Sequence, residues 1–184
     1  LSIDALYESN LVDHYFVYNN KAADNSKKSR FNISKESIVG LAEDMKKGLK
    51  KKKNIYKTHP VLYVSTTLYC GNRGIPSRSG SSDLSKANFE LNIIKNVLSK
   101  IPHKVHYKPY YSKRYSGPSI ELELAKNKDN IYINNEEVDL RYIIGNFRIV
   151  VTSRATSTIG WCYLSGKPVI YIENEDNRLT KKAS

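Results

Sequence analysis

The chain has 184 residues, 40% of them hydrophobic, which is enough for one full domain with its own core and not comfortably for two. Its formal net charge of +12 indicates an anionic partner: a phosphorylated small molecule, a nucleic acid or an acidic membrane surface. The two cysteines, Cys70 and Cys162, exclude a disulfide framework and a zinc pattern, and no apolar run approaches the length of a membrane span. We therefore expect a cytoplasmic protein in which Cys162 is a small core residue.

The N-terminal third of the chain carries the weakest pattern. Residues 11–18 have apolar positions typical of a strand, and residues 19–30 are polar and loop-like. From Ser37, apolar side chains recur at helical spacing as far as Leu49, and Ser34 is positioned to cap that helix. These residues predict one strand and one helix before the main pattern of the chain begins.

From residue 61 onward, five strand patterns alternate with four helix patterns. The strands are short β-branched or apolar runs, predicted at residues 61–67, 104–108, 131–133, 148–152 and 169–172. The helices are predicted at residues 84–101, 118–125, 138–147 and 157–165. This alternation predicts an α/β fold, a Rossmann-like parallel sheet with helices on both faces. We assign the fold to residues 58–184 and treat residues 1–57 as a partial or linker-like N-terminal segment with one helix.

The stretch from Arg148 to Asn174 shows this pattern most clearly. A β-branched strand is followed by a polar turn, a short helix from Ser157 and a second strand. Gly166 stands where a helix needs a left-handed residue to stop, and Pro168 lies just beyond it. Strand, helix and strand form a right-handed βαβ crossover. The turn before the helix offers free backbone N–H groups and a positive dipole, which predicts an anion site.

Polar side chains follow each predicted strand of this sheet. Ligands of parallel α/β sheets bind outside the carboxyl ends of the strands, so we expect these side chains to converge on one rim. The candidate donor-binding residues on this rim are Thr66, Thr67, Arg73, Lys108, Tyr110, Asn134, Glu136, Arg154, Thr156, Ser157 and Thr158. The cations can neutralise a phosphate or carboxylate, and Tyr110 can stack on a base or sugar. Helix capping also explains Thr156 and Ser157, and capping is compatible with anion binding.

Metal binding is not expected from the histidines. His103 and His106 lie three residues apart at a predicted strand, and the sequence offers no third ligand nearby. No Ser–His–Asp arrangement can be defended, and catalytic residues stay unassigned.

Three segments together resemble the C-terminal half of a GT-B glycosyltransferase: VLYVSTTLYCGNRG, HYKPYYSKRY and DLRYIIGNFRIVVTSRATSTIGWCYLSGKPVIYIEN. More narrowly, they are similar to bacterial surface-carbohydrate biosynthesis transferases, a group that includes Kdo transferase domains of capsule and O-antigen synthesis. The resemblance covers residues 60–175. Thr156-Ser157-Thr158 match the Ser/Thr motif that meets the donor phosphate in related enzymes. Lys108-Pro109-Tyr110 fall where many relatives that use CMP-sugars carry a His-Pro pair, with Lys108 in place of the histidine.

This resemblance implies that residues 58–184 are a nucleotide-sugar-binding domain, one half of a GT-B glycosyltransferase. The implied donor is CMP-Kdo, used without a metal or other cofactor. The implied acceptor is a glycan or glycolipid of capsule or lipopolysaccharide synthesis, met in the cytoplasm with a peripheral contact to the inner-membrane surface. A GT-B enzyme also needs an N-terminal acceptor domain, for which residues 1–57 are too few. We therefore expect an incomplete enzyme that shows no sugar transfer by itself.

Two other functions fit the same residues. One is transfer of a polyol phosphate from a CDP-linked donor, which uses a similar half-fold. The other is a non-enzymatic nucleic-acid-binding module, motivated by the charge of +12 and the 14 tyrosines. A nucleic-acid binder tracks a long phosphate backbone, whereas the basic residues here are spread along the chain. The lysine run Lys50–Lys53 fits a solvated helix end better than a membrane-surface patch, so we favour the glycosyltransferase domain, with no nucleic-acid partner.

Overall fold

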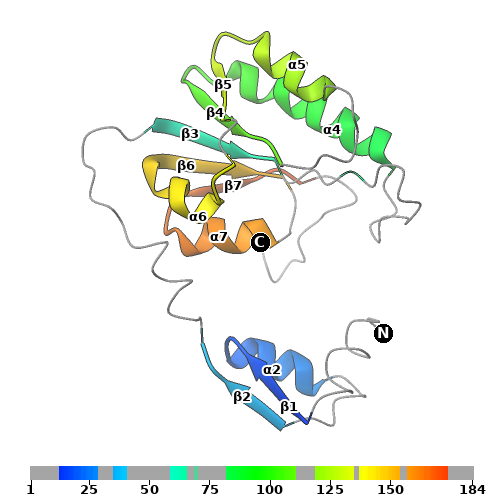
Figure 1. Ribbon diagram of the computed structural model, residues 1–184, viewed down its shortest axis with the longest axis vertical. Helices are drawn as coiled ribbons and strands as arrows, with labels where there is room; N and C mark the ends of the chain where they lie inside the picture. The colour runs from blue at the N-terminus through cyan, green and yellow to red at the C-terminus, as the bar shows by residue number, and fades with distance from the viewer. Residues whose placement is uncertain are drawn as a thin grey trace. The chain divides into compact units, whose positions relative to one another are not determined.

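The computed structural model describes residues 13–28, 35–40, 59–65, 69, 82–110, 119–134, 137–153 and 157–173. The chain divides into two compact units, Leu1–Lys50 and Lys51–Ser184. The first unit holds a small βαβ motif and the second an α/β domain (Figure 1).

The first unit contains two parallel strands, β1 (His14–Val17) and β2 (Lys35–Ile38), connected through helix α2 (Asn20–Lys27). Asn19 caps the helix, because its side-chain oxygen accepts a hydrogen bond from the Ala22 N–H at 2.8 Å. The predicted strand at residues 11–18 is therefore confirmed over the span of β1.

Two other predictions for this unit are corrected over the described residues. The predicted start of a helix at Ser37 is wrong, because Lys35–Ile38 is a strand paired with β1 and Gly40 follows it with a φ of 68°. Strand pairing outweighs the helical spacing of the apolar residues here, and residues 41–49 lie outside the described ranges. The predicted loop at residues 19–30 contains α2. Its residues are mostly polar, so no apolar stripe marks the helix in the sequence.

The second unit is built on a five-stranded parallel sheet with the order β5-β4-β3-β6-β7. The strands are β3 (His59–Val64), β4 (Val105–Lys108), β5 (Ile131–Ile133), β6 (Phe147–Thr152) and β7 (Val169–Tyr171). In the sheet register, Val61 of β3 lies opposite Val105 of β4 and Ile149 of β6. The five predicted strands and their parallel arrangement are confirmed, with small shifts at the strand ends.

Helices cover both faces of this sheet (Figure 1). On one face lie α4 (Asp83–Asn96), a short 3₁₀ turn η2 (Leu98–Lys100) and α5 (Ile120–Lys126). On the other lie α6 (Leu140–Ile143), its 3₁₀ continuation η3 (Ile144–Asn146) and α7 (Ser157–Leu164). The second unit is thus α/β and Rossmann-like, as the alternation of patterns predicts.

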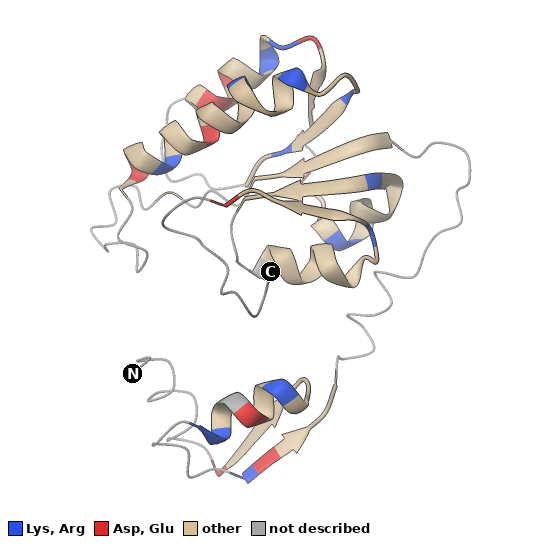
Figure 2. Cartoon of the chain, turned by 180° about the vertical axis from the view of Figure 1, so that it is seen from behind, with Lys and Arg blue, Asp and Glu red and all other residues tan. Residues whose placement is uncertain are grey.

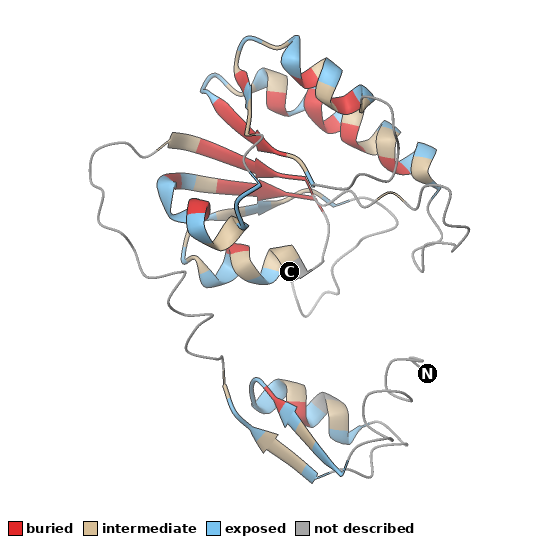
Figure 3. Cartoon of the chain, in the orientation of Figure 1, coloured by how far each residue is buried: buried red, intermediate tan, exposed pale blue. Residues whose placement is uncertain are grey.

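The main core lies between the sheet and the two helices α4 and α5. Figure 3 shows buried residues on these strands and on parts of both helices. Its fully or nearly fully buried side chains are Val61, Tyr63, Ile93, Ile94, Leu98, Val105, Tyr107, Ala125, Ile131 and Val151. Cys162 of α7 is also fully buried, which confirms it as a small core residue. Burial raises the pKa of its thiol to about 11.

The buried face of α4 includes two charged side chains. Leu84 is 71% exposed, whereas Lys86 and Glu90 are buried. Lys86 Nζ lies 3.1 Å from Asp83 Oδ1, and Glu90 accepts hydrogen bonds from tyrosines of the sheet. Charged and polar side chains can take core positions where each has a partner.

The end of α7 agrees with its prediction, whereas the start of α5 differs from it. Gly166 has a φ of 66°, the left-handed stop that the sequence predicts, and β6, α7 and β7 form the predicted parallel βαβ unit. α5 begins at Ile120 after the cap Ser119, whose Oγ accepts from the Leu122 N–H at 3.3 Å. The helix therefore begins two residues later than the predicted start at residue 118.

Candidate functional site

The strand order of the sheet reverses between β3 and β6, its two central neighbours. From β3 the chain crosses through α4 to β4, and from β6 it crosses through α7 to β7 on the opposite face. Because these connections leave adjacent strand ends in opposite directions, a crevice opens outside the carboxyl ends. This crevice is the position at which parallel α/β sheets bind ligands.

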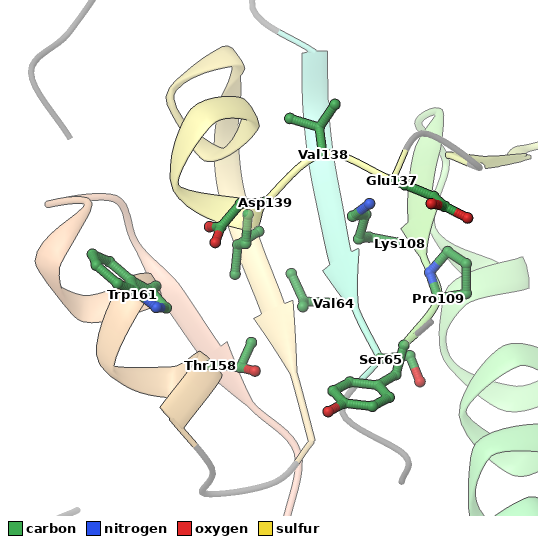
Figure 4. Close-up of a pocket in the computed structure, with 11 residues that line it drawn as sticks. Val64, Ser65, Lys108, Pro109, Glu137, Val138, Asp139, Thr158 and Trp161 are labelled. Atoms are coloured by element: carbon green, nitrogen blue, oxygen red, sulfur yellow. The ribbon is translucent and has the colours of Figure 1, made fainter. Parts of the chain in front are cut away.

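A pocket of about 520 Å³ lies at this position (Figure 4). Its walls come from the ends of β3 and β4 and from the starts of α6 and α7. The lining residues are Val64, Ser65, Lys108, Pro109, Tyr110, Glu137, Val138, Asp139, Leu140, Thr158 and Trp161. The volume falls in the range of small-molecule sites, roughly 300–1,000 Å³.

Three of the predicted site residues line this pocket: Lys108, Tyr110 and Thr158. Lys108 ends β4 and is only 8% exposed, whereas Tyr110, two residues further on, is 46% exposed. Thr158 lies in the first turn of α7, the helix predicted to open on an anion site. Residues from two distant parts of the sequence therefore share one cavity, as expected from their positions after parallel strands.

The remaining predicted site residues are not among the described lining. Asn134 follows β5 and is not among the lining residues. Its backbone N–H donates to the Tyr107 carbonyl at 2.8 Å. Ser157 is the first residue of α7, and only its backbone is described. The residues outside the described ranges are Thr66, Thr67, Arg73, Glu136, Arg154 and Thr156.

Hydrogen bonds join the strand ends next to the pocket. Thr152 Oγ1 donates to the Val64 carbonyl at 3.2 Å and ties the end of β6 to the end of β3. The Ser65 N–H donates to the Lys108 carbonyl at 3.0 Å and ties β3 to β4. Because all four residues are buried, these bonds hold the backbone from which the pocket side chains project.

The start of α6 forms another wall of the pocket. Asp139 caps this helix, since its Oδ1 accepts from the Arg141 N–H at 3.0 Å and lies 3.5 Å from Arg141 Nε. The Arg141 guanidinium lies over the Trp161 ring of α7, 5.7 Å from the ring centroid. This cation–π contact joins the two helices that contribute Asp139 and Trp161 to the lining (Figure 4).

Sequence reasoning did not identify Glu137, Asp139 and Trp161 as site residues. Asp139 stands just before a short helical pattern, a cap signal that could have located the start of α6. Trp161 has no comparable signal. Most of α7 is apolar, so its sequence does not show which side faces the crevice.

The described lining combines one cation, two carboxylates and two large rings. Lys108 is the one Lys or Arg among these lining residues, Glu137 and Asp139 carry the carboxylates, and Tyr110 and Trp161 carry the rings. A cation binds phosphate or carboxylate, a carboxylate accepts hydrogen bonds from hydroxyls, and a ring stacks on a base or sugar. The pocket therefore suits a small molecule with an anionic group, hydroxyls and a ring.

The rings of His59 and His106 lie next to each other elsewhere in the sheet. The His59 and His106 ring centroids are 4.2 Å apart, with Phe147 and Tyr132 beside His106. His103 precedes β4, so only His106 of that pair lies on the strand. Within the part of the chain that the structure describes, no group of three or more His, Cys, Asp or Glu side chains could hold a metal ion.

The described helices and strands carry both signs of charge. Figure 2 shows Lys and Arg interleaved with Asp and Glu along them, so most of the net charge of +12 belongs to residues outside the described ranges. Among the described helices, none is long and apolar enough to cross a membrane.

No protein-family model matches the chain, and a search of curated proteins finds no significantly similar sequence.

Proposed function

We propose that Lys51–Ser184 is the donor-binding domain of a GT-B-type glycosyltransferase that makes bacterial surface polysaccharide. The donor we favour is a CMP-activated sugar, with Kdo first. The observation that carries the proposal is that Lys108, Tyr110 and Thr158 line the same pocket. These three residues are donor-binding candidates from their positions after strands and from the resemblance of the sequence to such transferases.

Lys108 would bind the donor phosphate. Its side chain projects from the end of β4 and is 8% exposed, so its charge acts where little water screens it. A charge-assisted hydrogen bond in such a position is worth about 1.5–3 kcal/mol. Thr158, in the first turn of α7, would add a neutral donor beside the same phosphate.

The remaining lining fits the rest of a nucleotide sugar. Tyr110 and Trp161 supply ring faces on which a base or sugar can stack. Glu137 supplies a carboxylate that can accept hydrogen bonds from ribose or sugar hydroxyls. Transfer to a glycan or glycolipid acceptor at the inner-membrane surface would then require no metal.

A nucleic-acid-binding module is less well supported. A pocket of about 520 Å³ suits one small molecule better than the long backbone of a nucleic acid. Transfer of a polyol phosphate from a CDP-linked donor uses the same pocket chemistry and is distinguished by experiment.

The test is calorimetric titration of the protein with CMP, CDP and UDP. We expect CMP to bind, and Lys108→Met to weaken CMP about 10- to 100-fold, because it removes the charge and keeps the buried stem. Thr158→Ala should weaken CMP less than Lys108→Met does, because a neutral hydroxyl makes the weaker hydrogen bond.

The matched control is Lys104→Met. Lys104 directly precedes the same strand, with its Nζ 5.5 Å from the Tyr132 ring centroid, and does not line the pocket. Its replacement should leave CMP affinity unchanged. Equal weakening by both lysine variants would remove the pocket assignment. Tighter binding of UDP than of CMP would remove the CMP-sugar donor, and tighter binding of CDP would favour the polyol-phosphate reaction.

A further inference from the structure

Four buried polar side chains form a hydrogen-bonded chain on the α4 face of the sheet. Tyr63 of β3 donates to Glu90 Oε2 at 2.9 Å, and Tyr107 of β4 donates to Glu90 Oε1 at 2.7 Å. The Tyr63 hydroxyl also lies 3.2 Å from Ser153 Oγ, directly after β6. None of the four is more than 1% exposed.

The direction of each bond follows from the number of protons. A tyrosine hydroxyl has one proton, and Tyr63 gives its proton to Glu90, so Ser153 donates to the Tyr63 oxygen. Burial and the Glu90 charge raise the pKa of Tyr63 and of Tyr107 well above the usual value, so both stay protonated donors. One carboxylate on α4 thus holds β3, β4 and, through Tyr63, the end of β6.

Two of the anchored residues stand directly before residues that line the pocket. Side chains alternate between the faces of a strand, so Tyr63 points to α4 while the next residue, Val64, lines the pocket. Tyr107 and Lys108 have the same relation on β4. Ser153 directly follows β6, the strand that precedes α7 and Thr158 in the chain.

Filling a core with these polar side chains costs more free energy than filling it with apolar ones. Burying a carboxylate costs several kcal/mol before its partners compensate, and an apolar side chain would fill the same space. A fully satisfied polar network instead specifies one arrangement of the elements that it joins. Here these elements are the three strands whose ends lead into the pocket.

We propose that Glu90 is a positioning residue, which sets the ends of β3, β4 and β6 relative to the pocket. The inference deepens the proposed function and rests on it where ligand affinity is concerned. Glu90 does not line the pocket and acts through Tyr63, Tyr107 and Ser153.

The first test uses two buried tyrosines as a matched pair. Tyr63→Phe and Tyr107→Phe each remove one hydroxyl bonded to Glu90, but only Tyr63 contacts Ser153. In amide hydrogen exchange of the full chain, Tyr63→Phe should speed exchange of the segment 153–164 about fivefold, the effect of losing roughly 1 kcal/mol. Tyr107→Phe should leave that segment unchanged. Equal acceleration of it in both variants, or in neither, would overturn the proposal.

The second test measures CMP affinity in a double-mutant cycle. Ser153→Ala and Tyr63→Phe remove the same hydrogen bond, so each should weaken CMP about fivefold. The double variant should bind no more weakly than Tyr63→Phe alone. Independent, multiplying losses would overturn the coupling.

The control is Tyr132→Phe, which alters an exposed tyrosine of β5 and should change neither measurement. If wild-type protein binds no CMP but the exchange pattern appears, the positioning role is supported and the proposed function fails. If CMP binds and the exchange pattern is missing, the positioning role fails by itself.

Discussion

The His106 imidazole is enclosed by the rings of His59, Phe147 and Tyr132 and is 8% exposed. Its Nε2 is buried and makes no hydrogen bond within the part of the chain that the structure describes. Burial, with the nearby charges of His59 and Lys104, lowers the pKa of His106 from 6.5 to about 4. The folded protein therefore strongly prefers the neutral imidazole.

This preference predicts a loss of stability in mild acid. Between pH 6.5 and about 4 the unfolded chain binds a proton at His106 that the folded protein does not bind, so folding becomes less favourable as the pH falls. Urea unfolding at pH 7 and pH 5 should show this loss in the wild type. It should be smaller by about 1–2 kcal/mol in His106→Phe, which has no titrating group.

The control for this prediction is His103→Gln, because His103 is exposed and precedes β4. It should show the same difference between the two pH values as the wild type. A His106→Phe variant that is as acid-sensitive as the wild type would contradict the assignment of the effect to His106.

At the scale of a helix, two glycines of the α7 region predict opposite effects of alanine. Gly166 has a φ of 66°, a conformation that costs a residue with a Cβ about 1 kcal/mol. Gly160 lies inside α7 and is exposed. A Cβ added at either glycine meets no atom within 4 Å, so backbone conformation alone decides the outcome.

We therefore predict that Gly166→Ala destabilises the protein by about 1 kcal/mol, and that Gly160→Ala stabilises it by up to about 1 kcal/mol. Urea unfolding of both variants at pH 7 measures the difference directly. Changes of the same sign in the two variants would show that packing, not backbone preference, governs this helix.

The elements of the second unit were predictable where local preference and tertiary structure agree. β6 is a β-branched run, and Gly166 marks the end of α7, so both were read from short stretches of sequence. Lys108, Tyr110 and Thr158 were found because the carboxyl ends of parallel strands meet at one edge.

Elements and site residues that depend on distant partners could not be predicted in this way. β2 is a strand because it pairs with β1, although its own residues continue into a helical pattern. Glu90 is buried because two tyrosines from the sheet satisfy its oxygens. Trp161 lines the pocket because of the side that α7 turns toward it. The sequence of a mostly apolar helix does not show which side that is.

At the scale of the whole molecule, the division at Lys50 and Lys51 predicts an independently folding domain. Lys51–Ser184 contains the five-stranded sheet, the main core and the whole pocket. Expressed without residues 1–50, it should keep the urea midpoint of its transition and bind CMP within about twofold of the full chain. Calorimetry and urea unfolding of both proteins check this, and an insoluble or molten shorter protein would show that the first unit is needed for folding.

The joint between β3 and β6 also sets the order in which the sheet can assemble. Thr152 and the Val64 carbonyl that it binds are 88 residues apart in the chain, with two other strands made between them. Closing so long a loop is slow, because its entropy is lost before the contacts form. Until β6 arrives, one edge of β3 has no neighbour in the sheet, and unpaired edges promote aggregation during folding. Since the pocket lies at this joint, ligand binding should be the last property to return during refolding.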